Sequence, residues 1–114
     1  STRRKILKSY LADQKAIDLK PGEPLFYNNK AAAYIELNQY AKAHEELDKA
    51  EKLFDEGLKD YSKRGKVLAR RASLLAKEGK YDQSITEYEK SLLEDGVQKV
   101  RDELKVVKKM KKEK

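Results

Sequence analysis

Several residue types are scarce in this chain of 114 residues, and each scarcity excludes a class of protein. The absence of cysteine excludes a disulfide scaffold, a thiolate zinc site and a cysteine nucleophile. A single histidine excludes a metal site built from several histidines. Five glycines and two prolines are too few for the many turns of a β-sandwich or barrel. No apolar run approaches the roughly 18 residues of a membrane span. These absences predict a protein that is not an enzyme, holds no cofactor or metal, and fits a reducing, cytoplasmic compartment.

Charge, in contrast, is plentiful. Charged residues make up 41% of the chain and aromatic residues only 8%, a composition that favours a helical protein. The net charge of +7 comes from the two ends, because residues 1–20 carry +4 and residues 99–114 carry +5, whereas the middle carries −2. Such ends can contact nucleic acid or acidic lipid. Lysines without interleaved aromatic residues carry no sequence readout, so we interpret both ends as solvated helix ends.

The chain contains an internal repeat. Residues 38–50 match residues 79–91, and small residues recur at Ala43 and Ser84. A partial third copy lies upstream, where Ser9 aligns with Ala43 at an offset of 34 residues. The repeat unit therefore has 34 residues, and the 41-residue offset between the other two copies includes seven inserted residues. Small residues let two antiparallel helices approach closely, which predicts helix–turn–helix units. The small residues of this pattern are Ala31, Ala43, Ala50, Ala72, Ser84 and Ser91.

These patterns predict an all-α fold of stacked helical hairpins. Pro21 and Pro24 separate the first two helices, and Gly57, Gly79 and Gly96 mark later boundaries. The predicted helices span residues 3–19, 24–37, 40–57, 60–78, 81–95 and 97–112. We expect one domain made of a partial first repeat (1–22), a second repeat (24–57), a third repeat (65–96) and a C-terminal capping helix (97–114).

With this period and these residues, the chain resembles a tetratricopeptide repeat domain. More narrowly, it is similar to the peptide-binding domains of the Hop, or stress-inducible, co-chaperone family, and most of all to the middle domain, which binds the ninety-kilodalton heat-shock protein. The segments that carry the resemblance are 26–34, 60–61, 66–70, 80–81 and 88–92. The resemblance covers about residues 8–107 and implies an α–α superhelix that recognises other proteins.

In that family a two-carboxylate clamp binds the acidic C-terminal tail of a ninety- or seventy-kilodalton heat-shock protein. The resemblance implies that Asn29, Lys66 and Arg70 are clamp residues in this chain. Lys66 and Arg70 are four residues apart and therefore share one helix face. Arginine can hold one carboxylate with two parallel hydrogen bonds while lysine neutralises another. We therefore predict a co-chaperone-type adaptor for an acidic peptide. Glu36, two turns after Asn29 on the same face, is an acid that could compete with that peptide.

The chain departs from the family pattern in its first repeat. The family's first repeat begins with a helix that supplies one lysine and one asparagine to the clamp, and residues 1–7 contain no Lys-x-x-x-Asn. The second helix of that repeat carries Asp13 where the family has a large aromatic residue. We therefore expect three of the five clamp positions and a first repeat without its first helix.

Two other functions stay open. The predicted helix 3–19 carries apolar residues whose partner within the repeat is missing, so a second copy could cover them by dimerisation or helix exchange. These residues are Ile6, Leu7, Tyr10, Leu11 and Ile17. Alternatively, the basic segments 1–8 and 99–114 could bind nucleic acid, which the lack of interleaved aromatics argues against. We expect no membrane partner.

Other polar and aromatic residues have a structural interpretation. We expect Asn28 to be an ordinary exposed helix residue and His44 to be a surface or half-buried structural residue. Asn29 differs because asparagine is a poor helix former and because it occupies the sixth position of its repeat. The tyrosines expected to pack between helices are Tyr27, Tyr34, Tyr40, Tyr81 and Tyr88.

Overall fold

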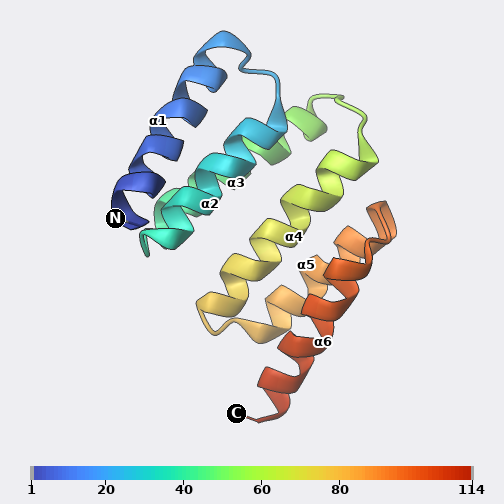
Figure 1. Cartoon of the computed structure of the whole chain (residues 1–114). Coiled ribbons are helices and arrows are strands. Elements are labelled where there is room, and N and C mark those ends of the chain that lie inside the picture. The colour runs from blue at the N-terminus through green and yellow to red at the C-terminus, as the bar shows by residue number, and fades with distance from the viewer. Residues whose placement is uncertain (1, 114) are drawn as a thin grey trace. The chain divides into compact units, whose positions relative to one another are not determined.

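The structure, a computed structural model, describes residues 2–113, and all regular structure in that range is α-helical (Figure 1). The helices are α1 (Thr2–Leu19), α2 (Pro24–Glu36), α3 (Tyr40–Asp55), α4 (Tyr61–Lys77), α5 (Tyr81–Glu94) and α6 (Gln98–Lys112). They belong to two compact units. The first contains α1–α3 and ends at Lys59, and the second contains α4–α6 and begins at Asp60. The predicted all-α fold is confirmed for the described residues, and none of their helices is long and apolar enough to span a membrane.

Two acidic residues cap helix starts. The Glu23 carboxylate accepts a hydrogen bond from the backbone N–H of Leu25 at 3.2 Å, at the start of α2. Pro24 follows it in the first turn of the helix. Its lack of a backbone N–H costs no hydrogen bond there, because the N–H groups of the first turn have no acceptor within the helix. Asp60 accepts a bond from the backbone N–H of Lys63 at 3.0 Å, at the start of α4. Both caps satisfy N–H groups that the first turn of a helix leaves without partners.

Left-handed residues follow three of the helices. Asn38 has φ 60°, Gly57 has φ 114° and Gly79 has φ 78°. Glycine adopts this backbone without steric penalty, and asparagine tolerates it better than most residues. All observed helix ends lie within two residues of the predicted ones. The largest difference is in α3, which ends at Asp55 rather than residue 57, because the left-handed Gly57 cannot continue a right-handed helix.

Small residues set the packing of the first unit. Ala31 on α2 and Ala43 and Ala50 on α3 have no exposed surface. Their size allows the two helix backbones to lie close together, as the repeat pattern predicts. Helix α1 packs on α2, where the rings of Tyr10 and Tyr34 meet edge to face with their centroids 5.4 Å apart. Helix α2 therefore contacts both of the other helices of its unit.

The second unit uses serines at the equivalent positions. Ser84 and Ser91 on α5 donate hydrogen bonds to the backbone carbonyls of Ala72 and Gly65 on α4, both at 2.7 Å. A buried hydroxyl that bonds to the neighbouring backbone fixes both the distance and the register of the α4–α5 hairpin.

Helix α6 packs on α5 through its apolar side. Val100, Leu104 and Val107 are buried in one cluster that also contains Ala72 and Tyr88. Lys111 on α6 also forms an ion pair with Asp82 on α5. The opposite side of α6 is exposed and rich in lysine.

Ala43→Leu is expected to lower the free energy of unfolding by about 1–3 kcal/mol, because a side chain with no exposed surface has no room to grow. The matched control is Ala41→Leu, two residues earlier on the exposed side of α3, which should change that free energy by less than about 0.5 kcal/mol. Urea denaturation followed by circular dichroism measures both. Equal effects would contradict close packing at Ala43.

Asn28 was predicted to be exposed, and this prediction is wrong. Its side chain is buried, only 5% exposed, and its Oδ1 atom has no hydrogen-bond partner within the described residues. Asn29 is exposed, because successive residues of a helix point about 100° apart. His44 is half-buried, as predicted, and the five tyrosines expected to pack between helices are all buried or half-buried.

Candidate functional site

Asn29 lines a hollow between α1 and α2 in the first unit. The hollow has a volume of about 270 Å³. Its walls are Ile6, Ser9 and Asp13 from α1, and Asn29, Ala32, Ala33 and Glu36 from α2. Glu36 shares the hollow with Asn29, as their seven-residue spacing predicts.

Two carboxylates give this hollow an acidic character. The Oδ2 atom of Asp13 is buried without a hydrogen-bond partner among the described residues. Burial raises the pKa of Asp13, and the positive charge of Lys30 partly offsets that rise. Together with Glu36, Asp13 favours a cation or a hydrogen-bond donor in the hollow. No group of three acidic or histidine side chains within residues 2–113 is placed to hold a metal ion.

Lys66 and Arg70 lie one turn apart on α4, in the second unit. Lys66 is exposed and Arg70 is half-buried. Neither takes part in the ion pairs described within residues 60–113, and the Nε atom of Arg70 is buried without a hydrogen-bond partner there.

A buried tyrosine lies beside Arg70. Burial and the neighbouring carboxylate of Glu103, to which the Tyr88 hydroxyl is hydrogen-bonded, raise the pKa of Tyr88, while Arg70 and a hydrogen bond with Ser73 lower it. The rise prevails, so the Tyr88 hydroxyl stays neutral at physiological pH. Tyr88 therefore lies close to both the Glu103 carboxylate and the Arg70 guanidinium.

The three predicted clamp residues belong to two units. Asn29 is in the first unit, and Lys66 and Arg70 are in the second. Each lies on the first helix of a helical hairpin, and none is fully buried. That the three residues act together on one peptide stays a prediction.

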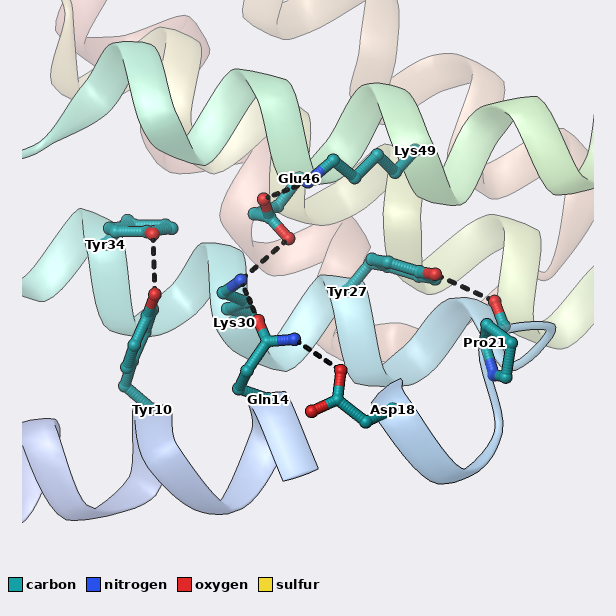
Figure 2. A network of polar contacts seen from close by, with 9 residues as sticks. All are labelled: Tyr10, Gln14, Asp18, Pro21, Tyr27, Lys30, Tyr34, Glu46 and Lys49. Carbon is teal, nitrogen blue, oxygen red and sulfur yellow. Dashed lines mark hydrogen bonds and ion pairs between the residues drawn. The ribbon is translucent and has the colours of Figure 1, made fainter. Parts of the chain in front are cut away.

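One feature of the first unit was not predicted: a buried polar network around Lys30 (Figure 2). Lys30 is only 7% exposed. Its ammonium donates a hydrogen bond to Gln14 and lies 3.6 Å from one oxygen of Glu46. The other oxygen of Glu46 accepts a bond from Lys49 at 2.9 Å, and Gln14 in turn donates to Asp18 at 2.9 Å. The network links all three helices of the unit.

The repeat carries the signal for this network. The 41-residue offset aligns Lys30 with Arg71 and Glu46 with Glu87. Glu87 forms an ion pair at 3.6 Å with Lys90, three residues later. Glu46 pairs in the same way with Lys49, three residues after it, in the first unit. Arg71 is half-buried, with a buried Nε atom. A cation on the first helix and a glutamate on the second therefore recur as a polar feature of the repeat.

The chain matches models of the tetratricopeptide repeat at residues 14–45 and 65–96, which together make up more than half of its length. It is 30% identical over 78 residues to small glutamine-rich tetratricopeptide repeat-containing protein 2 of Mycosarcoma maydis, a match that covers 68% of this chain and 20% of that protein. It is 32% identical over 99 residues to the Hsp70-Hsp90 organising protein of Plasmodium falciparum, covering 87% of this chain and 17% of that protein. The chain thus spans a fifth or less of these curated relatives.

A solved structure agrees with these matches. The TPR2AB domain of yeast Sti1, determined in complex with pHSP90, superposes with a TM-score of 0.86 at 28% identity, over 96% of this chain and 42% of that chain. The predicted resemblance to the Hop family is confirmed as a similarity of sequence and fold. From its 34-residue period, its helical hairpins and both repeat matches, the chain belongs to the tetratricopeptide repeat family.

Proposed function

We propose that this chain is a co-chaperone-type interaction module that binds the acidic C-terminal peptide of a heat-shock chaperone through Asn29, Lys66 and Arg70. The observation that carries the proposal is the pair of cations on α4, one turn apart and with no described acidic partner in their unit. Two cations at the clamp positions of a repeat family, Lys66 exposed and Arg70 half-buried, suit a ligand with two carboxylates.

The related proteins point to the same class of partner. Yeast Sti1 carries pHSP90 on its TPR2AB domain, and the relative from Plasmodium falciparum is named as an organiser of Hsp70 and Hsp90. The fold is that of a protein-interaction family. We therefore propose an adaptor without enzyme activity that works in the cytoplasm.

The proposed chemistry is a division of labour among three side chains. Arg70 holds one carboxylate with two parallel hydrogen bonds, Lys66 neutralises the second as a point charge, and Asn29 donates from its amide. The acidic hollow beside Asn29 opposes a peptide carboxylate placed there. With three of the family's five clamp positions, we expect a dissociation constant on the order of tens of micromolar or weaker.

The test is a calorimetric titration with a short acidic peptide that ends in aspartate. The same peptide with an amidated C-terminus should bind at least about tenfold more weakly, because it loses one charge-assisted contact to the clamp. A second amidated peptide, with one added glutamate to restore the net charge, is the matched control. Equal binding by the free and amidated peptides would show that the cations attract charge without forming a clamp.

A further inference from the structure

A buried polar contact joins the three helices of the second unit at Tyr88. The Tyr88 side chain on α5 is only 3% exposed and belongs to the apolar cluster that packs α6 on α5. Its hydroxyl donates a hydrogen bond to the carboxylate of Glu103 on α6 and accepts one from Ser73 on α4. A buried hydroxyl that has both a donor and an acceptor partner fixes their positions. Glu103 is only half-buried, yet this contact anchors its carboxylate to the interior.

Arg70 approaches the same hydroxyl from α4. It lies three residues before Ser73, so the two side chains share one side of the helix. Its positive charge acts on Tyr88, which places the guanidinium close to the hydroxyl. The Nε atom of Arg70 is buried and has no hydrogen-bond partner among residues 2–113. The guanidinium of Arg70 and the carboxylate of Glu103 therefore both lie near one buried hydroxyl.

We propose that Tyr88 and Glu103 are positioning residues for Arg70. The carboxylate that Tyr88 anchors attracts the guanidinium and limits the directions in which it points. This inference rests on the proposed function, in which Arg70 binds a carboxylate of the peptide. Neither Tyr88 nor Glu103 contacts that peptide.

The physical gain is pre-organisation of a long side chain. An arginine in water samples many rotamers, and a ligand that binds it must restrict them at a cost to affinity. Opposite charges attract more strongly near the protein interior than in water, because the effective dielectric constant is lower there. A carboxylate held in place by Tyr88 therefore restricts Arg70 before the peptide arrives.

The arrangement gives α6 a part in peptide binding. Glu103 precedes the buried Leu104, which packs with Val100 and Val107 in the cluster that holds α6 on α5. The core therefore sets the position of the Glu103 backbone. Peptide affinity should depend on this residue, although it lies on another helix, 33 positions after Arg70.

The first test uses the protein without peptide. In a proton–nitrogen NMR spectrum, the Nε–H signal of Arg70 is assigned by its loss in Arg70→Ala. Tyr88→Phe removes one hydroxyl without changing the net charge, and it should speed exchange of this buried proton with water by about tenfold or more. The backbone amides of α4 should keep their wild-type exchange rates. Tyr81→Phe is the matched control, because Tyr81 is another tyrosine of α5 that packs on the same cluster, and it should change nothing.

The second test is a titration with the acidic peptide that has a free carboxylate. Tyr88→Phe and Glu103→Gln should each weaken binding by about three- to tenfold, whereas Tyr81→Phe should stay within about twofold of wild type. Glu103→Gln makes the protein more positive, so an effect of charge alone would tighten binding instead. Asp102→Asn is its matched control, because Asp102 is the preceding acid on α6 and is exposed. It changes the net charge equally and should not weaken binding.

The two readouts separate this proposal from the proposed function. If wild type binds no peptide, the proposed function fails, and the exchange of the Arg70 proton still decides whether Tyr88 and Glu103 hold its side chain. An exchange rate equal to that of wild type in either folded variant overturns the proposal. So does peptide binding by Glu103→Gln that is as tight as that of wild type or tighter. If Tyr88→Phe fails to fold, Glu103→Gln decides both questions.

Discussion

Glu46→Ala is expected to lower the free energy of unfolding by about 3–5 kcal/mol. Glu46 is 4% exposed, and its two oxygens hold Lys30 at 3.6 Å and Lys49 at 2.9 Å. The variant leaves the buried ammonium of Lys30 with Gln14 as its remaining hydrogen-bond acceptor and without a counter-charge. A buried charge without a partner costs far more than the loss of a surface ion pair.

Chemical denaturation followed by circular dichroism measures this effect. Glu45→Ala is the matched control, since Glu45 is the preceding residue of α3 and is exposed, and it should cost less than about 0.5 kcal/mol. The double variant K30M/E46L should recover most of the loss, because packed apolar residues can replace a buried ion pair at little cost. A Glu46→Ala protein as stable as the Glu45→Ala control would mean that the network adds nothing to stability.

Arg70→Ala should weaken binding of the acidic peptide by about ten- to a hundredfold. The proposed contact that this variant loses is charge-assisted and bidentate, and worth about 1.5–3 kcal/mol. Lys66→Ala should weaken binding less, because lysine acts as a point charge without a fixed pair of donors. Isothermal titration with the free-carboxylate peptide measures both variants.

Lys105→Ala is the control for these cations, because Lys105 is an exposed lysine on α6 of the same unit. It removes one positive charge without touching α4. Arg70 lies close to the buried Tyr88, so its removal can also affect folding. Thermal unfolding of each variant ensures that a loss of stability is not mistaken for a loss of affinity. If Arg70→Ala binds as tightly as Lys105→Ala, only net charge attracts the peptide.

The helices could be predicted from the sequence because their signals are local. The backbone of each turn is set by its own residues, such as Pro24, Gly57 and Gly79. The observed helix ends therefore lie within two residues of the predicted ones. The small residues at 34- and 41-residue offsets also identified the hairpins, since close approach of two helices requires small side chains wherever the backbones meet. The clamp candidates Asn29, Lys66 and Arg70 came from the resemblance to the Hop family, and their role stays a prediction.

Burial of polar residues could not be predicted in the same way. Asn28 and Asn29 are chemically identical neighbours, yet the first is buried and the second is exposed. Lys30 is charged and still lies inside, because Gln14 from α1 and Glu46 from α3 meet it there. A residue's own type sets only its solvation energy in isolation, whereas its burial depends on what distant parts of the chain place around it.

The sequence by itself therefore determined the six helices of residues 2–113 and the repeat, because each depends on local backbone preference or on spacing along the chain. Only the tertiary structure showed that Lys30 is neutralised inside the first unit and that Asp13 carries an unpartnered oxygen beside Asn29. Both depend on the electrostatic surroundings of a side chain. In each case a decisive neighbour is 16 positions away, Gln14 and Glu46 from Lys30 and Asn29 from Asp13, and no local pattern brings such residues together.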